Sequence, residues 1–157
     1  MIKKILLWLS VICLSVTIFA FSAKPGKEST DISMKIAEKT ADVAQKNIEV
    51  EQKDKKDSFE ALHRAIRKGA HFAEFKLLAV LVYFLARSYN LTIKASIIIS
   101  LGYCLLFAAS DEIHQLFVDG RRGMARDVLL DFCGALTGVL ICSIPAKLRK
   151  NKNKVQF

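Results

Sequence analysis

Ionisable residues recur in pairs at helical spacing within otherwise apolar parts of the chain. Residues three or four positions apart lie on one face of a helix, so the members of each pair can act together. Their types, imidazole with carboxylate and carboxylate with carboxylate, are those used to bind metals, move protons or hold charged ligands. The pairs are His71 with Glu74, Asp111 with His114, and Asp127 with Asp131.

Three chemistries fit this set of residues. Two His/acid pairs suit a Zn or Fe site. Alternatively, His114 with Asp111 or Glu112 could act as catalytic residues that move protons in hydrolysis or transfer on a lipid-linked phosphate. The chain contains no G-x-S-x-G, H-E-x-x-H or glycine-rich phosphate-loop motif in support. The third chemistry is non-catalytic binding of a charged ligand. The sequence therefore leaves open whether the protein is an enzyme. We assign no residue to a metal and expect no cofactor.

A short turn beside these residues carries Arg121 and Arg122 between Gly120 and Gly123. Planar guanidinium groups bind phosphate and carboxylate through paired hydrogen bonds. The arginines are therefore predicted to hold an anionic head group, to form salt bridges with nearby acids, or both. The acids available for this are Asp111, Glu112 and Asp127. The residues predicted to line the binding site are Arg121, Arg122, His71, Glu74, Gln115, Asp127 and Asp131.

Four uncharged stretches must position these groups. The chain has 157 residues, of which 52% are hydrophobic and 25% charged. The four stretches without a charged residue are 5–23, 77–86, 95–110 and 132–146. With their flanks, these stretches have the length of membrane spans, roughly 20 residues each. Gly134 and Gly138 form a G-x-x-x-G face in the last one, which predicts close contact with another helix. We therefore expect an all-α membrane protein with four transmembrane helices that lies in the lipid bilayer, and no nucleic acid as partner.

The net charge of +9 indicates the orientation of these helices. If the N-terminus is inside, the inner flanks hold nine Lys and Arg and no acid. Cationic connectors mark the cytoplasmic side of membrane proteins. Both termini are therefore predicted to be cytoplasmic, and the His/acid pairs fall in the outer halves of the last three spans.

This orientation divides the chain into four parts. Residues 1–23 form the first transmembrane helix, with a secretory signal sequence as the alternative. Residues 24–68 form an extracytoplasmic amphipathic helical segment, in which Asp57 and Glu60 resemble a capping box before a helix at 58–68. Residues 69–146 form a three-helix membrane core, and residues 147–157 a basic cytoplasmic tail. The sequence does not indicate the oligomeric state.

Taken together, the motifs resemble the VanZ-like family of small membrane proteins. The resemblance begins with Ser22 and Pro25 of an F-S-x-x-P pattern and continues through residues 67–75, R-K-G-A-H-F-A-E-F. It is strongest over residues 110–123, where S-D-E-x-H-Q precedes G-R-x-G. Two positions depart from the family pattern, since Asp119 stands where proline is frequent and Asp131 where some members carry asparagine.

The resemblance implies a setting for the protein. The family's namesake is associated with resistance to teicoplanin, a glycopeptide that binds cell-wall precursors. This implies a bacterial plasma membrane, a first helix that is retained, and a task on the outward face. The expected partner is an anionic lipid-linked cell-wall precursor or a glycopeptide, bound or acted on at the outer leaflet. Alternatives are an intramembrane hydrolase or transferase on a lipid phosphate or glycan, and a structural or sensing partner of another membrane protein.

Overall fold

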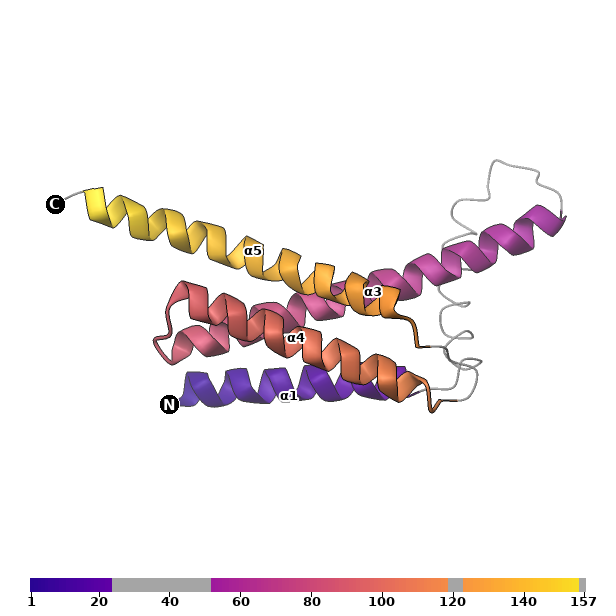
Figure 1. Ribbon diagram of the computed structural model, residues 1–157, viewed down its shortest axis with the longest axis horizontal. Coiled ribbons are helices and arrows are strands. Elements are labelled where there is room, and N and C mark those ends of the chain that lie inside the picture. Colours follow the sequence, from indigo (N-terminus) through magenta and orange to yellow (C-terminus); the bar gives the residue numbers. More distant parts are fainter. Residues whose placement is uncertain (24–51, 119–122, 156–157) are drawn as a thin grey trace.

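The computed structural model describes residues 1–23, 52–118 and 123–155, and these residues form four α-helices and no strand (Figure 1). Each helix contains a stretch long and apolar enough to cross a membrane, which confirms the predicted all-α, four-span fold. The helices are α1 (Ile2–Ser22), α3 (Gln52–Ser88), α4 (Ile93–Gln115) and α5 (Ala125–Val155).

Only part of the predicted amphipathic segment can be compared with the structure. Residues 24–51 lie outside the described residues, whereas the rest of the segment forms the beginning of α3. The capping-box prediction at Asp57 is wrong, because the helix begins at Gln52 and Asp57 lies within it. The residues between Gln52 and Asp57 are polar and include no proline or glycine, so the helix continues through them.

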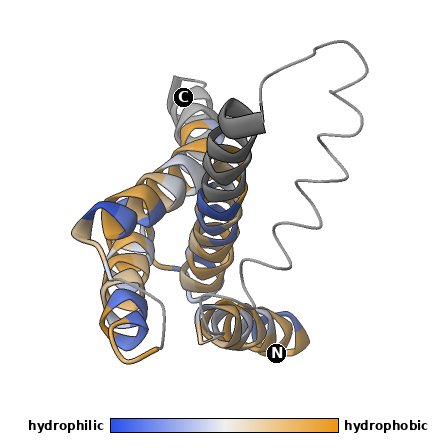
Figure 2. Ribbon diagram, turned by 90° about the vertical axis from the view of Figure 1, so that its right-hand side faces the viewer, coloured by the Kyte–Doolittle hydropathy of each residue, from blue (hydrophilic) through white to orange (hydrophobic). Residues whose placement is uncertain are grey.

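The α3 helix is the centre of the bundle, because it packs extensively against each of the other three helices. The α5 helix packs on both α3 and α4, whereas α1 packs mainly on α3 and only slightly on α4 (Figures 1 and 2). Met1 and the α3–α4 turn lie at one end of the bundle, here called the N-terminal end. The end of α1, the end of α4 and the start of α5 lie at the other, here called the polar end (Figure 1).

Small residues bring α5 close to α3. A Cβ atom on Gly134 would lie 2.4 Å from the carbonyl oxygen of Phe72, and one on Gly138 would lie 2.4 Å from that of Lys76. Such distances are closer than any side chain permits, so glycine is required at both positions. The predicted role of the G-x-x-x-G face in close helix contact is therefore confirmed.

The α1 helix buries one narrow stripe and exposes the rest. The buried residues recur three or four positions apart, which places them on one face: Val11, Ser15, Ile18 and Ser22. The remaining faces carry large exposed apolar side chains such as Leu9 and Val16. These faces suit lipid rather than water, as expected for a span at the periphery of a bundle.

The N-terminal end is held by contacts to the α3–α4 turn. Trp8 Nε1 donates a hydrogen bond of 3.1 Å to the hydroxyl of Tyr89, and Lys4 Nζ lies 4.4 Å from the centre of the Tyr89 ring. Asn90 adopts a left-handed conformation with φ 60°, and Thr92 caps α4 by accepting a hydrogen bond from Ala95 N. These contacts fix the turn and the start of α1 together.

Candidate functional site

A buried hydrogen-bond network joins α1 to α4 at the polar end. Ser22 Oγ donates to Asp111 Oδ2 at 2.6 Å, and Gln115 Nε2 donates to the same oxygen at 3.0 Å. Gln115 Nε2 also donates a longer hydrogen bond of 3.4 Å to Ser22 Oγ. The side chains of Asp111 and Ser22 are fully buried. Two donors on one carboxylate oxygen stabilise its charge where water is excluded, and the second oxygen, Oδ1, has no hydrogen-bond partner among the described residues.

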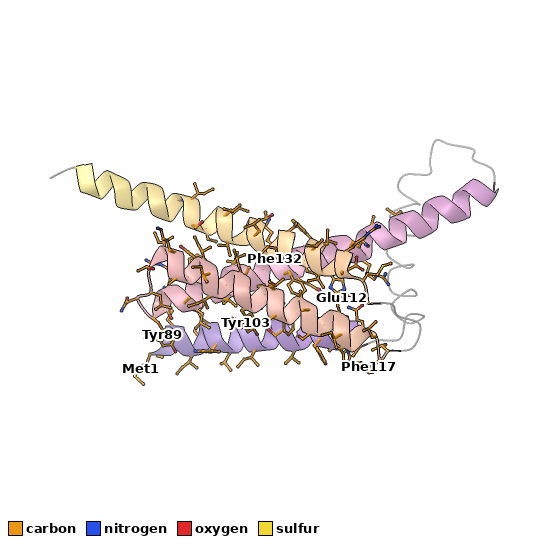
Figure 3. The ribbon with its side chains drawn as sticks, viewed as in Figure 1. Met1, Tyr89, Tyr103, Glu112, Phe117 and Phe132 are labelled. Carbon is orange, nitrogen blue, oxygen red and sulfur yellow. The ribbon has the colours of Figure 1, made fainter. Side chains whose placement is uncertain are left out.

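Glu112, the next residue of α4, fixes the path of the chain into α5. One of its carboxylate oxygens, Oε2, accepts a hydrogen bond of 2.7 Å from the backbone N–H of Met124. A Cβ on Gly123 would lie 2.6 Å from the Glu112 carbonyl oxygen, so only glycine permits this close approach. Figure 3 shows Glu112 and Phe117 at the opposite end of the bundle from Met1 and Tyr89.

An ion pair connects α3 to the first turn of α5. Lys68 Nζ lies 2.6 Å from Asp127 Oδ1, with the two side chains 43% and 23% exposed. The acidic side chain also suits the positive end of the α5 helix dipole. Asp127 is therefore already bonded to a described cation, although the sequence suggested the loop arginines as its partners.

The two His/acid pairs behave differently. His71 Nδ1 and Glu74 Oε2 are 3.7 Å apart on α3, as their spacing predicted. By contrast, the ring of His114 packs against that of Phe19 on α1, with centroids 4.2 Å apart. His114 Nδ1 has no hydrogen-bond partner within the described ranges, and Asp111 bonds to Ser22 and Gln115. The proposed His114–Asp111 catalytic pair is thus not joined by a described hydrogen bond.

Asp131 is the deepest acidic residue of α5. It is 2% exposed, and its Oδ1 has no hydrogen-bond partner among residues 1–23, 52–118 and 123–155. It interacts electrostatically with four other carboxylates, which come from α3, α4 and α5: Glu112, Asp111, Asp127 and Glu74. The polar end therefore gathers five carboxylates, here called the acidic cluster.

The loop arginines and the metal site are the remaining predicted features. Arg121 and Arg122 are not among the described residues, so their role as anion holders stays a prediction. Within the part of the chain that the structure describes, no three His, Cys, Asp or Glu side chains are placed to hold a metal ion. The arrangement of His71 and His114 therefore does not favour the metal site considered from the sequence.

Sequence reasoning missed three residues of the site. Ser22 and Lys68 were quoted as parts of motifs but were not assigned to the site, and Phe19 was not singled out. The signal for Ser22 was a hydroxyl on the last turn of an apolar helix. For Lys68 it was a cation at the edge of a span, on the face that carries His71 one turn later.

Four spanning helices with a buried polar network at one end define a small multi-pass membrane protein. The chain belongs to the VanZ/LLP1 family, whose family model matches residues 7–146. The match covers most of the first span, the whole of the other three, and every residue of the site described above. Neither the curated proteins nor the solved structures contain a match to the chain.

Proposed function

We propose that this VanZ/LLP1 protein lowers the sensitivity of a bacterium to teicoplanin-type glycopeptides, by binding at or near lipid-linked cell-wall precursors on the outer face of the plasma membrane. The observation that carries the proposal is the separation of charge along the bundle. The acidic cluster and the Ser22–Asp111–Gln115 network lie at the polar end. The described side chains at the other end include four cations: Lys3, Lys4, Arg87 and Lys94.

This separation favours one orientation in the membrane. Lys and Arg in short connectors mark the cytoplasmic side, so the N-terminal end faces the cytoplasm and the polar end faces outward. Lipid-linked wall precursors and the glycopeptides that bind them meet on that outer face. A site formed by the ends of α1 and α4, the part of α3 that carries His71 and Glu74, and the start of α5 is therefore at the right depth to contact either one.

Binding is favoured over catalysis by the bonding of the candidate catalytic groups. Asp111 Oδ2 is held by two donors, and Glu112 Oε2 is held by Met124 N. A general base needs to lie within hydrogen-bond reach of the proton that it removes, whereas these oxygens are used to join helices. A rigid, pre-formed polar end is what a binding surface requires.

Drug sensitivity tests the proposal. The full chain is expressed in a glycopeptide-sensitive host, and growth is measured against teicoplanin, vancomycin and an antibiotic that targets ribosomes. We expect reduced sensitivity to the glycopeptides and unchanged sensitivity to the antibiotic that targets ribosomes. Asp111→Asn and the Arg121→Ala/Arg122→Ala double variant should lose this protection at unchanged membrane levels.

The matched control is Ser100→Ala. Ser100 Oγ is buried but donates only to the Ser96 carbonyl of its own helix, so protection should be retained. Equal glycopeptide sensitivity with and without the wild-type chain would overturn the proposal. If protection survives both Asp111→Asn and the arginine double variant, the proposed function would stand, but these residues would not form its site.

A further inference from the structure

The turn between α3 and α4 gathers cations from three helices. Lys4 Nζ of α1 lies 4.4 Å from the centre of the Tyr89 ring. Arg87, in the last turn of α3, donates a hydrogen bond through Nη1 to the Leu91 carbonyl oxygen. Lys94 is the second residue of α4. The three cations around this turn, Lys4, Arg87 and Lys94, are here called the cationic turn.

Among the described residues, no acidic side chain lies near these charges. Asp and Glu are absent from three parts of the sequence: 1–23, 75–110 and 132–157. On α3, Glu74 is about 20 Å from Arg87 along the helix axis, and on α4, Asp111 is about 25 Å from Lys94. The cationic turn is therefore available to an anion that does not belong to the described bundle.

An exposed apolar side chain lies one helical turn deeper in the bundle than each cation, on the same helix. The pairs are Lys4 with Trp8, Arg87 with Phe84, and Lys94 with Ile98. Residues three or four positions apart share a helix face, so each cation has an exposed apolar surface beneath it. A phospholipid presents its groups in this order, with a phosphate above acyl chains.

Aromatic side chains place the cationic turn at the edge of the bilayer. Trp8 and Tyr89 are about half exposed, and they bond to each other through indole N–H and phenol oxygen. Tyr89 lies at the same end of the bundle as Met1 (Figure 3). Trp and Tyr are enriched where membrane meets water. One span ends at Ser88 and the next begins at Ile93, so the turn lies at the depth of lipid head groups.

We propose that the cationic turn is a binding surface for anionic phospholipids, whose acyl chains pack against Trp8, Phe84 and Ile98. Lys and Arg donate charge-assisted hydrogen bonds to phosphate oxygens, while the apolar side chains below contact the lipid tails. A soluble phosphate or a nucleic acid would use the cations alone. Anionic phospholipid would bind in either orientation of the chain, and with or without a role of the protein in resistance.

Spin-labelled lipids measure this preference. The full chain is reconstituted in phosphatidylcholine vesicles with a trace of spin-labelled phosphatidylglycerol or, in parallel, of spin-labelled phosphatidylcholine with the same acyl chains. The immobilised fraction of each label gives their relative affinity. Each Lys or Arg beside an anionic membrane surface contributes about a fivefold preference. The wild-type chain should therefore favour phosphatidylglycerol several-fold at low salt and less at high salt.

Arg87→Gln/Lys94→Gln should lose most of this preference. The matched control is Arg67→Gln/Arg126→Gln, which removes the same charge from the part of the bundle near the polar end and should keep the preference. Equal losses in the two double variants would overturn the proposal, because they would indicate a response to net charge alone. Equal immobilisation of both lipids by the wild-type chain would also overturn it, as would a preference that survives Arg87→Gln/Lys94→Gln.

If the variants do not fold, crosslinking of the wild-type chain still decides. Phosphatidylglycerol with a photoreactive group on its head group is added to the same vesicles, and the crosslinked peptides are identified by mass spectrometry. We expect crosslinks in peptides that contain residues 1–8 or 87–94. Crosslinks confined to peptides of the polar end, or none, would overturn the proposal.

Discussion

Ser22 ends α1 by donating a hydrogen bond of 2.6 Å to Asp111, which lies 89 positions further along the chain. This contact matters because α1 otherwise packs mainly on α3 and touches α4 at few positions. The donor, the acceptor and the second donor Gln115 are all buried. The position of the first helix at the polar end is therefore set by a polar contact and not by apolar packing alone.

Removing the Ser22 hydroxyl should destabilise the bundle. Ser22→Ala leaves a buried carboxylate oxygen with one donor fewer, and such a loss costs about 1–3 kcal/mol. Reversible unfolding in detergent would measure it. Thr17→Ala is the control, because the Thr17 hydroxyl is exposed and donates only to the Cys13 carbonyl of the same helix. Equal losses in the two variants would contradict a specific role for the α1–α4 contact.

Adding a methyl group at the α3–α5 contact should separate the two helices. Gly134→Ala and Gly138→Ala each place a Cβ against a backbone carbonyl oxygen of α3, and overpacking of this kind costs about 1–3 kcal/mol. Gly102→Ala is the matched change on α4, where a Cβ would meet nothing within 4 Å. It should be neutral or slightly stabilising. Thermal unfolding of the three variants in one detergent compares them, and an equally stable Gly134→Ala would refute the close contact.

The Lys68–Asp127 ion pair should contribute modestly. Because the Lys68 side chain is 43% exposed, solvent screens the pair, and we expect a coupling energy of at most about 1 kcal/mol. A double-mutant cycle with Lys68→Met, Asp127→Asn and the double variant isolates this energy. Additive effects of the two single changes would mean that the ion pair contributes nothing to stability.

The predicted orientation can be measured with reporter fusions. A reporter placed after Asn90, in the α3–α4 turn, should be active on the cytoplasmic side. One placed after Val118, which follows α4, should be active outside, because a single span separates the two positions. Reporters on the same side would contradict the four-span fold, whereas exchanged sides would keep the fold but reverse the proposed outward site.

The spans and the glycine contact followed from the sequence because both are local patterns. An uncharged stretch as long as a membrane span has few alternatives to forming a transmembrane helix. Gly134 and Gly138 share a face at any rotation of their helix. The His71–Glu74 contact has the same origin.

The partners of Asp111 and Asp127 could not be obtained in this way. Spacing on α4 places His114 on the same side as Asp111, but the packing of α1 places Ser22 there as donor and directs Phe19 to the His114 ring. Lys68 reaches Asp127 only because α3 and α5 approach so closely. Such pairings depend on how whole helices rotate and dock, which the charge pattern of a single helix does not determine.

The contacts of α1 also bear on how the protein is made. Trp8 bonds to Tyr89 and Ser22 to Asp111, which are 81 and 89 positions later in the chain. A ribosome therefore delivers α1 to the bilayer well before either partner exists. During that interval the Ser22 hydroxyl has to bond to other acceptors, such as a backbone carbonyl of its own helix, lipid head groups or water. Its contact with Asp111 forms only after α4 has entered. Final assembly of the polar end is thus a late event in biogenesis, when the end of the first span bonds to the third.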